Sequence, residues 1–167
     1  MKTFLFLAGF MLLINGCSYA VSRDLVAQSD KSITLQQIQA DPARLAGTTV
    51  ILGGEIIAIR VAKQGTLIEV LERPLDLWGK PKRTVQSGGR FLLLHSRALD
   101  TIVFTPGREI TAAAQVKGTF EKGLTGEEIE HPLLVTRELK LWERERAADR
   151  PIWWDPLHDP HAQPRRE

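Results

Sequence analysis

The sequence predicts a mainly β protein whose folded part is a small OB-like antiparallel barrel of five to six strands, with a short N-terminal helix. After residue 47 the apolar residues follow a period of two, and turn residues separate the successive runs. The runs begin roughly 8 to 20 residues apart and helical patterning precedes them, as is typical of small barrels. A flatter β-sandwich, or an open sheet covered by the front helix, is the alternative.

The N-terminus has the pattern of an export signal. A short basic region precedes an apolar run from Phe4 to Ile14, and the only cysteine, Cys17, follows it. The run has the length of a secretory signal and is too short to span a bilayer as a helix. We therefore expect residues 1–16 to be a signal peptide. An ordinary secretory signal that is cut elsewhere, or an uncleaved anchor, is the alternative.

The motif LLINGC at residues 12–17 resembles the lipobox of bacterial lipoproteins. The resemblance implies that Cys17 becomes the mature N-terminus and carries acyl chains, which would anchor the protein stably because two or more chains suffice. Ser18 stands where Asp would retain a lipoprotein at the inner membrane. We therefore expect outer-membrane lipid as a partner, reached through acylated Cys17, and a lipid-anchored protein that faces the periplasm.

Residues 17–31 are mostly polar and show no sustained apolar period. We interpret them as the lipidated N-terminus and a tether, which as a flexible coil would hold the domain about 20 Å from the lipid. The alternative is that Tyr19, Val21, Leu25 and Val26 belong to a first strand or helix packed on the domain.

The folded domain is expected over residues 32–147, and it begins with two short helical turns. Thr34 can cap the first turn, and Gln37 completes a capping box with it. Asp41 and Pro42 can cap the second turn, with proline at the first helical position.

Five strands are expected, at residues 48–61, 66–72, 91–96, 109–120 and 133–142. Gly53 and Gly54 allow a bulge or a sharp bend in the first strand, as small barrels require. In the fourth strand the core face is expected to carry Ile110, Ala112, Ala114, Val116 and Phe120. In the fifth strand it is expected to carry Leu133, Val135, Leu139 and Leu141.

The loop at residues 75–90 gathers basic side chains around an aromatic ring. Its candidate ligand-binding residues are Trp78, Lys80, Lys82, Arg83 and Arg90. Such a set suits an anionic lipid or glycan, whose negative charge the side chains would attract. A lipid-anchored protein meets little nucleic acid, so we expect no nucleic-acid partner. The competing interpretation is a hydrated hairpin in which Trp78 closes one end of the core.

Residues 148–167 are expected to form a Pro-rich polar tail that contains Trp153, Trp154, His158 and His161. Two imidazoles and a carboxylate could bind a metal, but nothing visible fixes four ligands or orients the rings. We therefore expect no metal site and no cofactor.

No catalytic constellation is visible in the sequence, so we expect no enzyme. His95 and Ser96 are adjacent, and neighbouring residues of a strand point to opposite faces, so they cannot act as a base and its nucleophile. The alternative is an envelope hydrolase or metalloprotein that uses the histidines at positions 95, 131, 158 and 161.

Beyond the lipobox, four segments carry a resemblance to a known family: DPARLAGTTVILGGEI at 41–56, LIEVLERPLDLWGKP at 67–81, GGRFLL at 88–93 and PGREITAAAQVKGT at 106–119. With them the chain is similar to the Slp family of outer-membrane lipoproteins, known as starvation-inducible. The resemblance implies a role in envelope maintenance, starvation or stress, and an envelope protein as a further partner to consider. It brings no reaction with it.

Overall fold

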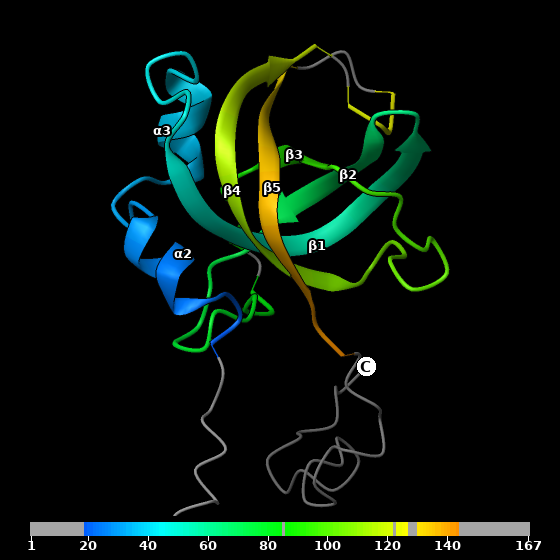
Figure 1. The fold of residues 1–167 in the computed structure, drawn as a ribbon, viewed down its shortest axis with the longest axis horizontal. Coiled ribbons are helices and arrows are strands. Elements are labelled where there is room, and N and C mark those ends of the chain that lie inside the picture. The colour runs from blue at the N-terminus through cyan, green and yellow to red at the C-terminus, as the bar shows by residue number, and fades with distance from the viewer. Residues whose placement is uncertain (1–18, 85, 122, 127–129, 144–167) are drawn as a thin grey trace, which may run out of the picture.

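The computed structural model describes residues 19–84, 86–121, 123–126 and 130–143, which form a closed barrel of five strands with two short helices on its outside (Figure 1). The helices are α2 (Arg23–Gln28) and α3 (Leu35–Ala40). The strands are β1 (Thr49–Ala62), β2 (Gly65–Glu72), β3 (Arg90–His95), β4 (Glu109–Phe120) and β5 (His131–Leu141). The predicted mainly β, OB-like barrel is confirmed.

The strands follow the order β1, β2, β3, β5, β4 around the barrel, and β4 closes the ring by pairing with β1. Four pairs are antiparallel, while β3 and β5 run parallel. An odd number of strands cannot alternate in direction all the way around a closed ring. One parallel pair is therefore unavoidable, and the barrel differs in this respect from the all-antiparallel barrel that the sequence predicted.

β1 bends where it passes from one partner strand to the other. Its first half pairs with β4 and its second half with β2, and Gly54 is paired to both. A Cβ atom on Gly54 would lie 2.0 Å from the backbone oxygen of Leu71, so the strands meet here only because the side chain is absent. Figure 1 shows that β1 is curved along its length, and its β-bulge lies between Ile56 and Ala58 rather than at the two glycines.

The barrel interior holds one continuous apolar cluster. Its fully buried members include Ile56, Ile68, Val70, Phe91 and Ile110. α3 contributes Leu35 and Ile38 to the same cluster, so this helix covers part of the barrel. The predicted capping box is present: the Thr34 hydroxyl accepts a hydrogen bond from the Gln37 N–H, and the Gln37 side chain accepts one from the Thr34 N–H. The second predicted helical turn is instead a run of hydrogen-bonded turns over residues 42–47.

Two predicted strand faces are partly wrong, in both cases because of a register shift. Phe120 was expected in the core but is 40% exposed, since the pairing of β4 with β5 shifts between Val116 and Gly118. In β5 the residue in the core is Leu134, while its neighbours Leu133 and Val135 are only partly buried.

A second shift, between residues 113 and 114 of β4, leaves Arg137 of β5 without a paired residue. Because one extra residue turns the following side chains to the other face of a strand, Leu139 and Leu141 then pack against the core as predicted.

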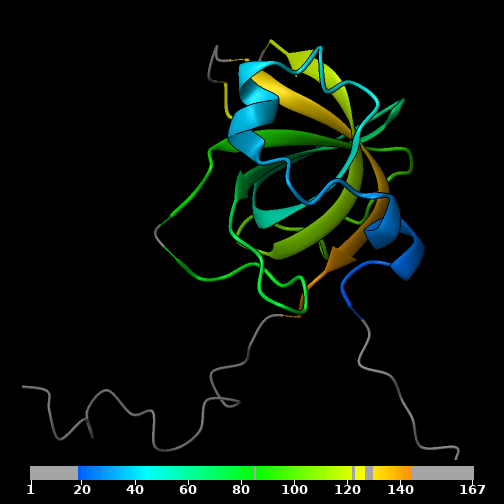
Figure 2. The same ribbon diagram turned by 90° about the vertical axis from the view of Figure 1, so that its left-hand side faces the viewer.

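Residues 19–31 lie on the barrel, which corrects the tether expected over residues 17–31 (Figures 1 and 2). Ala20 and Val21 are buried against Ala113 of β4, with Leu25 and Val26 beside them. The backbone of the segment is also held, because the Ser22 N–H donates to Glu138 and the Asp30 N–H donates to the Thr49 carbonyl. The alternative, in which this segment packs on the domain, is the observed arrangement.

The predicted signal peptide, Cys17 and the tail at 148–167 lie outside the described residues. Within the described ranges, no helix has both the length and the apolar character needed to cross a bilayer.

Candidate functional site

The segment between β2 and β3, residues 73–89, carries most of the predicted ligand-binding residues, and we call it the β2–β3 loop. Its tip is a tight turn around Asp76, whose carboxylate accepts hydrogen bonds from the N–H groups of Trp78 and Lys80, both at 2.8 Å. The turn leaves two large apolar side chains in water: Leu77 is 91% exposed and Trp78 is 56% exposed. Trp78 therefore does not close the core.

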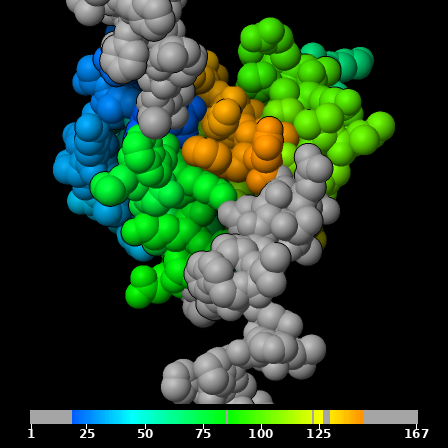
Figure 3. All heavy atoms as spheres, turned by 90° about the horizontal axis from the view of Figure 1, so that it is seen from below, coloured from blue at the N-terminus to red at the C-terminus, as the bar shows by residue number. Residues whose placement is uncertain are grey.

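The tip is fastened to the rest of the domain. The Ala20 N–H donates to the Trp78 carbonyl at 3.1 Å, and the Thr111 hydroxyl donates to the Gly79 carbonyl at 2.6 Å. The indole N–H of Trp142 in turn donates to the Thr111 oxygen at 2.9 Å. Hydrogen bonds therefore fix the backbone that carries the exposed side chains of Leu77 and Trp78. This part of the loop lies beside Ala20, near the start of the described chain. Figure 3 shows this end of the molecule, with the N-terminal segment in blue and the loop in green side by side.

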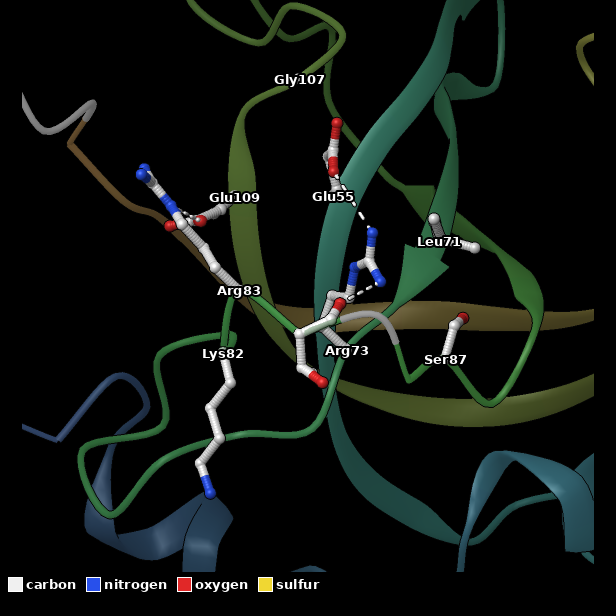
Figure 4. Close-up of a pocket in the computed structure, with 9 residues that line it drawn as sticks. Glu55, Leu71, Arg73, Lys82, Arg83, Ser87, Gly107 and Glu109 are labelled. Carbon is white, nitrogen blue, oxygen red and sulfur yellow. Dashed lines mark hydrogen bonds and ion pairs between the residues drawn. The ribbon is translucent and has the colours of Figure 1, made fainter. Parts of the chain in front are cut away.

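Lys82 and Arg83 line a groove of about 620 Å³ together with Arg73 (Figure 4). Two carboxylates share it. Arg83 lies 3.0 Å from Glu109, and Arg73 lies 3.8 Å from Glu55. Because three cations face two carboxylates in the groove, it offers little concentrated positive charge to an anion.

The fifth predicted residue, Arg90, lies elsewhere. It begins β3, and its Nη1 atom is 3.1 Å from the Glu69 carboxylate on β2. The structure therefore distributes the predicted set over three places: Trp78 and Lys80 at the tip, Lys82 and Arg83 at the groove, and Arg90 beside Glu69.

The sequence analysis did not predict the burial of Glu69, which is 0% exposed although it is ionisable. It accepts hydrogen bonds from the N–H groups of Leu124 and Thr125, at 2.7 and 3.2 Å, as well as from Arg90. Its neighbours Ile68 and Val70 face the barrel core, so Glu69 faces outward, under the segment at residues 123–126. The available signal was one acidic residue in the middle of the apolar strand sequence LIEVL.

This contact covers the surface that OB folds commonly use for ligands, which is the outer face of strands 2 and 3 beside the loop between strands 4 and 5. Glu69 of β2 and its register partner Leu92 of β3 both point away from the core cluster, yet both are 0% exposed. The outer face at these positions is therefore closed in this structure.

The histidines do not meet on the barrel. His131 begins β5 and is 5% exposed. In the parallel register Leu94 of β3 is paired with Val135 of β5, so the neighbouring His95 lies near residue 136. His131 is five positions away from residue 136, or about 16 Å along the strand. His158 and His161 lie outside the described residues. In the part of the chain that is described, no three His, Cys, Asp or Glu side chains are grouped to hold a metal ion.

His95 should titrate below its usual pKa of about 6.5. Partial burial lowers the pKa of its imidazole, and the positive charge of Arg97 lowers it further. As the pH falls through about 6.5, the unfolded chain takes up a proton that native His95 resists, so this group removes stability in acid. Titration of the His95 ring signal by NMR measures the effect, and Arg97→Ala should raise the pKa. A pKa at the usual value, or no response to Arg97→Ala, would contradict this assignment.

The sequence matches the family described as "Outer membrane lipoprotein Slp family" over residues 14–165, nearly the whole chain. Among curated proteins, no similar sequence is found.

Two solved structures resemble part of the fold weakly. The mitochondrial single-stranded DNA binding protein Rim1 of S. cerevisiae is 14% identical with a TM-score of 0.35, over 60% of this chain and 99% of that one. Pot1pC of Schizosaccharomyces pombe, bound to single-stranded DNA, is 9% identical with a TM-score of 0.32, over 61% of this chain and 82% of that one. Likeness this weak carries no argument about function.

Proposed function

The chain belongs to the Slp family of outer membrane lipoproteins, and from this we propose that acyl chains on Cys17 hold it to the outer membrane with its barrel in the periplasm. The observation that carries the proposal is the extent of the family match, which begins at residue 14 and so includes Cys17, the only cysteine of the chain. A thiol placed directly behind a signal-length apolar run is suited to acylation, and Ser18 favours transfer to the outer membrane.

We further propose that the barrel maintains the envelope during starvation or stress by binding, without catalysing a reaction. Three features of the described residues argue against catalysis at those places. The histidines of β3 and β5 are far apart, the cations of the groove are faced by carboxylates, and the outer face around Glu69 is covered. None of these places combines a nucleophile, a base and a group that orients the base.

Labelling of cells with radioactive palmitate tests the anchor. The wild-type protein should carry label and fractionate with the outer membrane, and Cys17→Ser should lose the label completely, because its hydroxyl cannot form the thioether. Ser18→Asp is the matched control: it should keep the label but move to the inner membrane. If Cys17→Ser kept both label and location, the proposed anchor would be wrong.

The same variants test the envelope role. In starved cells that lack the protein, the wild type should restore resistance to detergent, and Cys17→Ser should not, because it is no longer held at the membrane. Equal resistance with and without the protein would exclude a maintenance role under that condition.

A further inference from the structure

We propose that one end of the barrel rests on the lipid leaflet that holds Cys17, with Leu77 and Trp78 among the lipid head groups. We call this surface the lipid-facing end; it consists of Tyr19, α2 and the tip of the β2–β3 loop. The inference rests on the proposed acylation of Cys17 and adds to it a defined contact and orientation of the domain.

The first argument is the length of chain between the anchor and the folded domain. Tyr19 packs against the cluster of Ala20, Val21 and Ala113, and only Ser18 separates it from Cys17. Two residues span at most about 7 Å. The head-group layer of one leaflet is about 5 to 8 Å thick, the difference between the whole bilayer and its hydrocarbon core shared between two sides. The domain therefore cannot clear the lipid, and the surface around Tyr19 must lie against it.

The second argument is that the loop tip adjoins this point. Besides the hydrogen bond from the Ala20 N–H to the Trp78 carbonyl, Gly79 lies so close that a Cβ on it would be 2.9 Å from the Ala20 Cβ and 3.1 Å from the Tyr19 ring. Wherever the lipid surface approaches Tyr19, it also approaches the tip.

The third argument is the character of the tip. Leu77 and Trp78 are 91% and 56% exposed, and the side chains of Asp76 and Thr111 hold the turn that presents them through hydrogen bonds to its backbone. Exposed apolar side chains on a held turn gain by leaving water, and the amphipathic Trp ring favours the boundary between lipid and water. Between the tip and α2 runs a groove with mostly apolar walls, lined in part by Val26, Ala27 and Leu77.

Charge along α2 and the residues that follow it is balanced, since Arg23 and Lys31 are accompanied by Asp24 and Asp30. We therefore expect the contact to depend on the apolar tip more than on anionic lipid, and to form on neutral vesicles as well.

The rest of the barrel supplies matched controls. Val61 is 47% exposed near the β1–β2 hairpin, and Phe120 is 40% exposed at the end of β4. The β1–β2 hairpin and the end of β4 lie at the end of the barrel opposite α2 and the loop tip (Figure 1). If exposure alone caused lipid contact, these positions would also be in the lipid.

A fluorescent probe on a single new thiol tests the proposal, because acylated Cys17 cannot react with a maleimide. Lipidated Leu77→Cys and Val61→Cys, each labelled with an environment-sensitive dye, are reconstituted into vesicles of phosphatidylcholine, and separately of phosphatidylethanolamine with phosphatidylglycerol. Spin-labelled lipid should quench the probe at position 77 in both vesicle types. Aqueous iodide should quench the probe at position 77 severalfold less than the probe at position 61. Equal iodide quenching at the two positions would overturn the proposal, and contact on the anionic vesicles alone would overturn its apolar basis.

A second measurement asks whether the tip holds the domain down. A probe at Ala27→Cys on α2 should lose its quenching by spin-labelled lipid when Leu77→Ser and Trp78→Ser are combined, and keep it when Val61→Ser and Phe120→Ser are combined. If spin-labelled lipid still quenched the probe on α2 when Leu77→Ser and Trp78→Ser are combined, the loop tip would not be what holds this end of the barrel at the lipid.

Failure of the anchor itself is seen separately. Protein that does not sediment with vesicles, and whose Cys17 reacts with maleimide, would refute the acylation and with it this inference. Protein that sediments while position 77 stays in water would refute the orientation alone.

Discussion

Replacing Glu69 by alanine should reduce the free energy of unfolding by about 1.5 to 3 kcal/mol, the usual contribution of hydrogen bonds to a charged group. The carboxylate is 0% exposed and is bound by Arg90 and by the backbone of Leu124 and Thr125. Without it, the two N–H groups of the covering segment lose their acceptor, while Arg90, whose side chain is 30% exposed, keeps its hydrogen bond to the Thr125 hydroxyl. Domains of this size are typically stable by only about 5 to 15 kcal/mol, so this loss would be a large fraction of the total stability.

Urea unfolding of the mature chain, with Cys17→Ser as the background, measures this loss. Glu55→Ala is the matched control, because Glu55 also faces an arginine, at 3.8 Å, but its side chain is 42% exposed. Exposed pairs contribute about 0 to 1 kcal/mol, so the control should remain close to the wild type. Hydrogen exchange at the amides of Leu124 and Thr125 should also accelerate in Glu69→Ala alone. Equal losses in the two variants would show that Glu69 does not hold the covering segment.

The strands could be predicted from the sequence because the barrel buries one face of each strand. Apolar and polar residues therefore alternate along the strands. Thr34 and Gln37 were predictable for a similar reason, since a capping box depends only on residues three positions apart. The alternation no longer predicts which side chains face the core after a β-bulge, where a strand contains one extra residue. The bulge at Arg137 changes which leucines face inward, and nothing in the local pattern marks it.

Contacts between residues far apart in the chain could not be predicted from the sequence. Arg83 and Arg90 looked available to a ligand because their partners, Glu109 and Glu69, are 26 and 21 residues away. Similarly, residues 19–26 show no regular period, yet Ala20 and Val21 are buried, because the small side chain of Ala113 leaves room for them on the outside of β4. The sequence left open whether Trp78 closes the core, and both its exposure and its position beside the N-terminal segment required the fold.

Gly54→Ala should destabilise the domain by about 3 kcal/mol or more, at the upper end of the range for overpacked sites. The new Cβ would lie 2.0 Å from the Leu71 oxygen and 2.8 Å from the Leu71 carbonyl carbon, and both are backbone atoms that can move only if β2 moves. Gly54 is paired to β2 and β4 together, so separating the strands here opens the ring where β1 changes partners. The Arg73 N–H donates to the neighbouring Gly53 carbonyl at 2.9 Å, so the start of the β2–β3 loop should shift as well.

Gly88→Ala isolates the effect of the close backbone contact in Gly54→Ala. A Cβ at Gly88 would meet the ends of the Glu72 and Gln36 side chains at 3.0 and 3.1 Å, and such flexible groups can rotate away. Neither glycine has a positive φ, so the two substitutions differ mainly in whether the obstacle is backbone or side chain. Urea unfolding should show a loss of less than about 1 kcal/mol for Gly88→Ala, as for substitutions away from a packed core. If Gly54→Ala were equally mild, the closure of the barrel would tolerate a separation of β1 from β2.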